Sequence, residues 1–114
     1  LDENVPVAVG KVYDLVLWLL PKVEHFPKSH RFTVGERLTS HGLDLLTSIV
    51  EAAYAREKTP LLEQASRKVN STRYLLRMAK DLKLMSIDSY GFRAEKLAEI
   101  GRMVGGWSKA AAKS

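Results

Sequence analysis

Apolar periodicity of about 3.6 residues runs through most of the chain, and it restricts the possible fold more than any other feature. Apolar side chains recur three or four residues apart in four stretches, at about residues 7–24, 33–57, 60–84 and 87–107. This spacing lines one face of a helix, and no stretch shows the sustained alternation of a strand. Four helices of this length with short connections predict an all-α, up-down-up-down four-helix bundle in a single domain, residues 1–114.

Capping signals refine the predicted helix starts. Thr33 and Glu36 have the spacing of a capping box at the start of the second helix. Thr59-Pro60 is typical of an N-cap followed by proline in the first turn, and Ser86 is predicted to cap the fourth helix.

Three other segments are predicted from proline and polar composition. Residues 25–32 contain Pro27 and lack periodicity, so they are predicted to form a loop. Pro21 is expected to kink the first helix or loosen its last turn. Residues 109–114 are small and polar and are expected to fray.

Composition excludes several classes of protein. The 114 residues are 46% hydrophobic and 27% charged, which is typical of one globular domain. The absence of cysteine excludes disulfides, thiolate zinc sites and thiol nucleophiles. No apolar run reaches the ~18 residues of a membrane helix, and no signal peptide is visible, so a cytoplasmic location is expected.

Catalytic and metal-binding patterns are not found. His25, His30 and His41 have no metal-ligand spacing, and no glycine-rich phosphate loop is present. We therefore expect no enzymatic activity, no metal and no cofactor.

Positive charge is concentrated in the second half of the chain. Residues 59–114 hold 11 Lys and Arg against 5 Asp and Glu, whereas residues 1–58 hold 7 against 8. Arginine binds phosphate with two hydrogen bonds at once, and aromatic side chains are sparse here, so contact with a nucleic-acid backbone is predicted rather than base reading. A merely solvated face is the alternative. The predicted contacts with nucleic acid or a protein partner are Arg67, Lys68, Arg73, Arg77, Lys80 and Lys83, with Lys28 and Arg31 in the loop.

Several predicted helices carry a second apolar stripe. Helices that are apolar nearly all round are buried on more than one side, which favours an oligomer. The alternative is that these residues lie at helix edges within one bundle. Gly101 and Gly105 share a helix face, which indicates either a close helix approach or, with Gly106, the end of the helix. The predicted interface residues are Trp18, Leu43, Val50, Tyr54, Ile100, Met103 and Trp107.

Two stretches carry a resemblance to a known family. They are FPKSHRFTVGERL at residues 26–38 and EIGRMVGGW at residues 99–107. Both resemble the accessory variability determinant (Avd) of diversity-generating retroelements. Avd lies within a wider set of four-helix-bundle proteins, which includes those encoded in ribosomal-RNA intervening sequences, and the second stretch points to Avd.

This resemblance implies a barrel-like homopentamer of four-helix bundles. It also implies a basic surface that binds template RNA or other nucleic acid, and a direct complex with the element's reverse transcriptase. The protein would then be a non-catalytic subunit that supports error-prone cDNA synthesis during mutagenic retrohoming. The alternatives are a bundle protein of the ribosomal intervening-sequence type and a structural assembly module with no nucleic-acid role.

Overall fold

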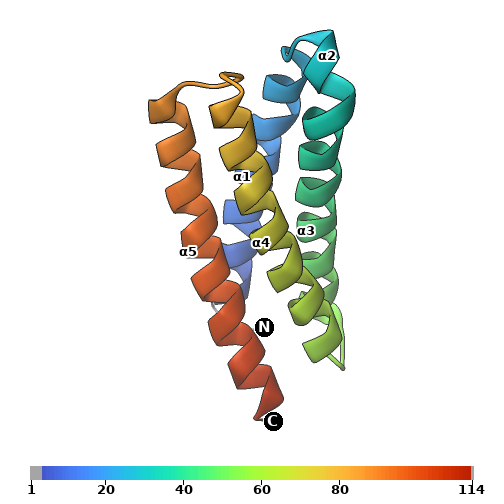
Figure 1. Ribbon diagram of the computed structural model, residues 1–114. Coiled ribbons are helices and arrows are strands. Elements are labelled where there is room, and N and C mark those ends of the chain that lie inside the picture. Colours follow the sequence, from blue (N-terminus) through green and yellow to red (C-terminus); the bar gives the residue numbers. More distant parts are fainter. Residues whose placement is uncertain (1–3, 114) are drawn as a thin grey trace.

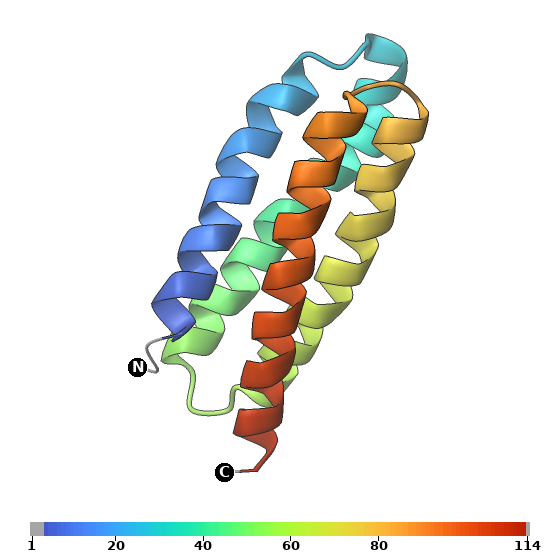
Figure 2. The ribbon, with the colours of Figure 1, turned by 90° about the vertical axis from the view of Figure 1, so that its left-hand side faces the viewer.

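Four long helices form an antiparallel bundle in a computed structural model that describes residues 4–113 (Figures 1 and 2). They are α1 (Asn4–Glu24), α3 (Glu36–Tyr54), α4 (Thr59–Asp81) and α5 (Ile87–Ala112). Helix α1 packs against α3 and α5, and α4 packs against the same two helices from the diagonally opposite corner. No strand occurs in the described part, so the predicted four-helix bundle is confirmed.

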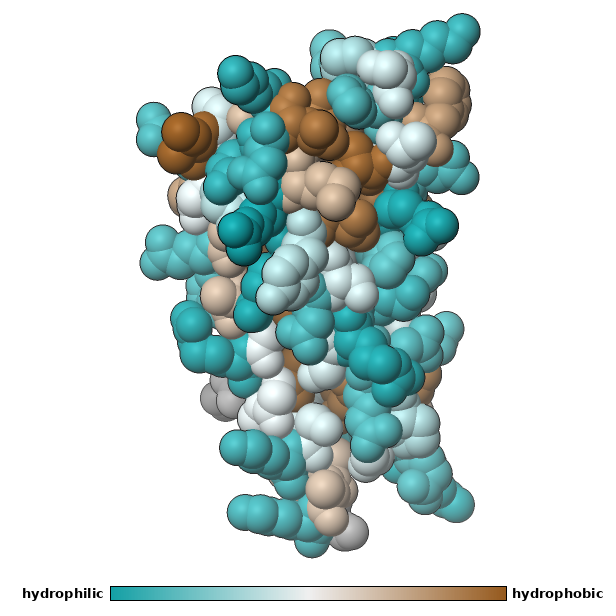
Figure 3. Space-filling model, viewed as in Figure 1, coloured by the Kyte–Doolittle hydropathy of each residue, from teal (hydrophilic) through white to brown (hydrophobic). Residues whose placement is uncertain are grey.

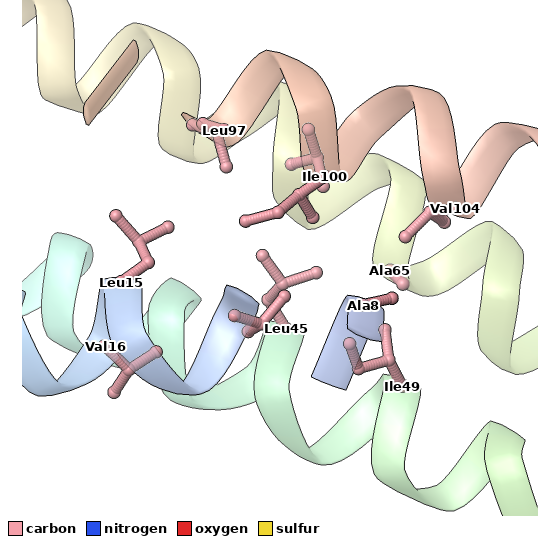
Figure 4. Close-up of a cluster of buried hydrophobic side chains, with 11 residues drawn as sticks. Ala8, Leu15, Val16, Leu45, Ile49, Ala65, Leu97, Ile100 and Val104 are labelled. Carbon is pink, nitrogen blue, oxygen red and sulfur yellow. The ribbon is translucent and has the colours of Figure 1, made fainter. Parts of the chain in front are cut away.

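The interior of the bundle is filled by aliphatic side chains from all four helices. Figure 4 shows Leu15, Leu45, Leu97 and Ile100 pointing toward one another across the centre. A second cluster, around Leu19, Phe26, Leu38 and Leu76, fills the end near α2. Most of the predicted inward faces are buried, and packing of these faces is what holds the helices together.

The segment between the first two long helices is more helical than predicted. Only residues 25–27 lie outside a helix, because α2 (Lys28–His30) and a π-helix, η1 (Arg31–Gly35), lead directly into α3. Thr33 therefore lies inside a helix, and its hydroxyl donates to the carbonyl of His30 at 3.2 Å. The predicted loop over residues 25–32 and the capping box at Thr33 are wrong for this reason.

The other helix ends follow from local hydrogen bonds. The Lys58 ammonium donates to the carbonyls of Ala52, Ala53 and Ala55, which closes the end of α3 before the predicted residue 57. Helix α4 ends before residue 84, because Lys83 has a positive φ of 62° and Leu84 N donates to Ala79 O at 2.8 Å. The positive φ of Lys83 and the hydrogen bond from Leu84 N together form a Schellman motif, although Lys83 occupies the position usually held by glycine.

Helix α5 begins as predicted and ends later. The Ser86 hydroxyl accepts from Ser89 N at 3.0 Å, which confirms the predicted cap. The helix continues through Gly105 and Gly106 to Ala112, so the predicted end near residue 107 is wrong. In the tail that was expected to fray, residues 109–112 are helical, and Ser114 lies outside the described residues. Pro21 lies in the last turn of α1 and does not interrupt that helix.

Candidate nucleic-acid interface

A shallow groove of about 350 Å³ lies between α4 and α5, on the face that the sequence predicts to bind phosphate. Helix α4 contributes polar side chains on one side, and α5 contributes small residues and an arginine on the other. The lining residues are Ser66, Val69, Asn70, Arg73, Ala98, Gly101 and Arg102. We call this the α4–α5 groove.

The groove exists because α5 approaches α4 at a glycine. A Cβ atom added at Gly101 would lie 3.2 Å from Val69 Cγ1 and 3.6 Å from Arg73 Nη2. The predicted close approach is therefore present at Gly101. It does not extend to Gly105, where an added Cβ would have nothing within 4 Å. The floor of the groove is consequently formed by Gly101 and Ala98, with no bulky side chain above it.

Two arginines in the groove have no partner within the described part of the chain. Arg73 and Arg102 are both exposed, and neither forms an ion pair or a side-chain hydrogen bond there. Their guanidinium groups can therefore donate to an external anion without first losing an internal partner. The hydroxyl of Ser66 and the amide of Asn70 add polar groups along the same groove.

Most of the other predicted basic residues are already engaged or lie elsewhere. Lys68 pairs with Asp44 at 3.5 Å, which turns it toward α3. Arg77 and Lys80 share Asp81, at 3.9 Å and 3.2 Å, and the Lys80 ammonium also lies 4.8 Å from the ring centre of Tyr90. Of the predicted stripe, Lys68, Arg77 and Lys80 are paired, and Arg73 is the member that lines the groove without an ion pair in the described part of the chain.

The remaining predicted contacts are not part of the groove. Arg67 is exposed and does not line it, and Lys83 lies beyond the end of α4. Lys28 is exposed on α2, while Arg31 donates to the carbonyl of Phe26 at 3.3 Å. Arg102 was missed as a binding residue, although the glycine one residue before it was noted. Only the pairing of α5 with α4 brings it opposite Arg73.

The residues predicted to form an oligomer interface fall into two groups. Ile100 is completely buried within the subunit, so its predicted place at an interface is wrong. Met103 and Trp107 are partly buried against the same core, and Trp18 packs against the second cluster. The prediction failed at Ile100 because α5 contacts both α1 and α4, so a wide arc of this helix faces inward, while Met103 and Trp107 stay predicted interface residues.

The exposed members of the predicted interface belong to a larger apolar surface. Leu43 and Val50 are 40% and 37% exposed, and Tyr54 is 79% exposed. Tyr13, which was predicted to face inward, and Leu17 are also exposed on α1. An added Cβ at Gly42 would lie 3.2 Å from Leu19 Cδ2 and 3.5 Å from Val16 Cγ2, so α1 and α3 are close at this level. We call Tyr13, Leu17, Leu43, Val50 and Tyr54 the α1–α3 apolar face.

A second exposed apolar surface lies near the end that carries α2. Figure 3 shows hydrophobic side chains gathered there. Two hollows of about 520 and 420 Å³ share Met78 and Leu82, with Phe32 beside one and Tyr74 beside the other. Leu82 was predicted to face inward, but it follows the end of α4 and is exposed. We call these four residues the α4 apolar patch.

A family comparison agrees with this architecture and covers nearly the whole chain. A model of the bAvd-like family matches residues 6–111. The chain belongs to the bAvd-like family. Members are related to the accessory variability determinant, a non-catalytic accessory protein, so the resemblance inferred from the two sequence stretches is confirmed.

The fold of this family member also occurs in a solved structure. A protein of unknown function from the S23 ribosomal protein family of Bacteroides thetaiotaomicron matches it with a TM-score of 0.84 and 16% identity. The match covers 92% of this chain and 97% of that chain. At this identity the likeness shows the fold alone. No curated protein matches the chain in sequence.

Neither a metal-binding cluster nor a membrane-spanning helix occurs in the described part of this bAvd-like chain. No group of three or more His, Asp or Glu side chains among the described residues could hold a metal ion. No helix in the same part of the chain is long and apolar enough to cross a membrane.

Proposed function

We propose that this chain is a non-catalytic accessory subunit of a diversity-generating retroelement. It binds template RNA or other nucleic acid through the α4–α5 groove, associates with the element's reverse transcriptase, and supports error-prone cDNA synthesis. The single observation that carries the nucleic-acid part is the pair of unpartnered arginines, Arg73 and Arg102, on the two sides of one groove. The bAvd-like family supports the retroelement setting and the association with a reverse transcriptase.

The chemistry of the groove suits a phosphodiester backbone. Two guanidinium groups can each donate paired hydrogen bonds to phosphate oxygens, and the floor of Gly101 and Ala98 leaves room for a chain to approach. The two arginines are the charged groups of the groove, so binding is expected to depend on charge more than on sequence. A net charge of +5 on each subunit adds a long-range attraction for nucleic acid.

The proposal includes assembly into a homopentamer through the α1–α3 apolar face. Large exposed apolar surfaces on a small protein mark interaction sites, and Leu43, Val50 and Tyr54 lie on one such surface. Five copies would bring five α4–α5 grooves together in one particle, which increases the avidity for a long RNA.

The groove can be tested with two double variants that remove the same charge. Arg73→Ser with Arg102→Ser removes the two arginines that line the groove. Lys68→Gln with Lys80→Gln removes two lysines that are already paired, with Asp44 at 3.5 Å and with Asp81 at 3.2 Å. Affinity for a labelled RNA, measured by fluorescence anisotropy, should fall about tenfold for the arginine variant and by less than about twofold for the lysine variant.

Two results would contradict the assignment. If both double variants weaken binding equally, net charge and not the groove controls affinity. If neither weakens binding, nucleic acid does not use this face. Failure of the wild-type protein to bind RNA and to co-purify with the element's reverse transcriptase would favour a purely structural assembly module.

A further inference from the structure

Two aromatic rings and two cations come together on the edge of α5 that faces away from the groove. Arg93 Cζ lies 4.5 Å from the ring centre of Trp18 on α1 and 4.9 Å from that of Phe92. Lys96 Nζ lies 5.3 Å from the Phe92 ring centre. We call these four residues the cation–aromatic cluster. Trp18 and Phe92 are far apart in the sequence, and the packing of α1 against α5 brings them to the same arginine.

The guanidinium of Arg93 has an unusual environment. The residue is half-buried, yet within the described part of the chain it forms no ion pair and no side-chain hydrogen bond. Burial lowers the pKa of Arg93, and the nearby Asp14 only partly offsets this effect. Because a guanidinium carries five N–H donors, Arg93 can donate to an external acceptor while it lies close to the two rings.

Phe92 is available to a ligand from the other side. Its side chain is 54% exposed although two cations already lie near its ring. A planar group can stack on this ring without breaking core contacts, because the ring lies on the helix surface and is not part of the core. The cluster therefore presents a flat apolar surface directly beside two positive charges.

The charges around the cluster favour an anion. Glu99, a carboxylate on the same edge of α5, is held by Lys11 at 2.8 Å, and this hydrogen bond lowers the pKa of Glu99. Lys96 also acts on Glu99, and Asp14 acts on Arg93. The two cations next to the exposed Phe92 ring are Arg93 and Lys96, and a phosphate placed there would be attracted by both.

We propose that the cation–aromatic cluster binds an unpaired nucleotide of single-stranded nucleic acid, with the base on Phe92 and the phosphate on Arg93 and Lys96. This inference rests on the proposed function only in taking nucleic acid as the partner. Single strands can splay a base out to stack on an aromatic ring or a guanidinium plane, whereas the bases of a duplex are already stacked on one another. The cluster would thus give the protein a preference for single strands, which the α4–α5 groove by itself does not supply.

The test compares single and double strands in the full-length protein. The probes are a labelled oligouridylate and a labelled oligothymidylate of about 12 nucleotides, and a duplex of the same length. Phe92→Leu keeps an apolar side chain but removes the aromatic face. It should weaken binding of both single strands about tenfold and change duplex binding by less than about twofold. Arg93→Lys keeps the charge but removes the planar group, and it should also weaken single-strand binding.

Tyr74→Leu is the matched control variant. Tyr74 is an exposed aromatic residue on α4, and no cation lies over its ring among the contacts of the described residues. If Tyr74→Leu removes the preference for single strands and Phe92→Leu does not, stacking occurs on α4 and the proposal is wrong. A loss confined to one of the two single strands would also overturn it, because base stacking does not depend on the ribose hydroxyl.

The remaining outcomes separate this inference from the proposed function. If Phe92→Leu weakens the single strands and the duplex equally, or leaves all three unchanged, the cluster is not a stacking site. The groove can still bind nucleic acid in that case, as the Arg73 and Arg102 variants would show. If the wild-type protein binds none of the probes, both proposals fail together. Thermal unfolding of each variant checks that the bundle is intact.

Discussion

The α4–α5 side and the α1–α3 side of the bundle use the same packing device for different purposes. In each pair a glycine brings two helices close, Gly101 in the first and Gly42 in the second. Unpaired arginines border the first approach, and exposed Leu and Tyr side chains border the second. The comparison teaches that close packing sets where a groove or face lies, while the flanking residues set whether that surface is cationic or apolar.

Charge placed on the α1–α3 apolar face should produce the largest effect. We expect the wild-type protein to have about five times the 12.8 kDa mass of one subunit by light scattering. Leu43→Lys with Val50→Lys should reduce the mass to that of one subunit, because two ammonium groups would be buried without partners at the interface. Nucleic-acid binding by the separated subunit should remain, but with lower avidity.

The α4 apolar patch supplies the matched control for this prediction. Met78→Lys with Leu82→Lys changes side chains of similar exposure on a different surface, and should leave the mass unchanged. If this second variant dissociates and the first does not, the subunits meet through the α4 apolar patch. A monomeric wild-type protein would contradict assembly altogether.

Substitution of the two glycines should lower the free energy of unfolding by different amounts on the two sides of the bundle. Gly42 is buried against Leu19 and Val16, so Gly42→Leu should lower the free energy of unfolding by about 3 kcal/mol. Gly101 opens on the groove, so Gly101→Leu should cost less, about 1 kcal/mol, while obstructing nucleic acid. Gly105→Ala has open space and should stabilise α5 by up to ~1 kcal/mol.

Urea unfolding of the three variants measures these differences. Equal losses for Gly42→Leu and Gly101→Leu would show that the groove floor is as tightly packed as the core. Destabilisation by Gly105→Ala would show that a partner, such as another subunit, covers this position.

Salt should affect binding to the α4–α5 side strongly. Raising the salt concentration from about 50 to about 200 mM should weaken RNA binding tenfold or more. Binding releases counterions from the RNA backbone, and this release is less favourable at higher salt. Arg73→Ser with Arg102→Ser should make the dependence shallower by about one unit of slope for each arginine. Affinity that does not respond to salt would be incompatible with phosphate contacts in the groove.

The sequence predicted the features that depend on local pattern. Apolar periodicity identified the four helices, and Ser86 was recognised as a cap because capping involves residues only three apart. Family membership was predicted from the two short stretches at residues 26–38 and 99–107, and the family match over residues 6–111 confirms it. Arg73 could be proposed as a contact from the sequence because the charge of α4 is visible on a helical projection, and its role stays a prediction.

Features that depend on tertiary pairing could not be predicted in this way. Arg102 becomes a binding candidate only when α5 lies beside α4, and Ile100 becomes a core residue for a similar reason. Trp18 and Arg93 meet only because α1 packs against α5. The sequence therefore indicated sparse aromatic side chains in the basic region and predicted contact with a nucleic-acid backbone only.

The smallest expected effect concerns His41, which lies on α3 where that helix faces α4. Its Nδ1 atom is buried without a hydrogen-bond partner, and burial, followed by the charge of Lys68, lowers the pKa of His41 below 6.5. Asp44 opposes this shift, and Arg37 adds to it. The folded protein therefore binds fewer protons than the unfolded chain just below pH 6.5, so stability falls as the pH falls through that range.

His41→Gln should remove this part of the pH dependence while leaving the bundle folded. The free energy of unfolding of the wild-type protein should decrease between about pH 7 and pH 5.5, and that of the variant should decrease less. The difference should be smaller than the glycine effects, because the ring is only half-buried and solvent screens its charge. Identical pH profiles would mean that His41 accepts a proton in the folded bundle as easily as in the unfolded chain. In that case the α3–α4 seam would be open to water, unlike the tightly packed approaches at Gly42 and Gly101.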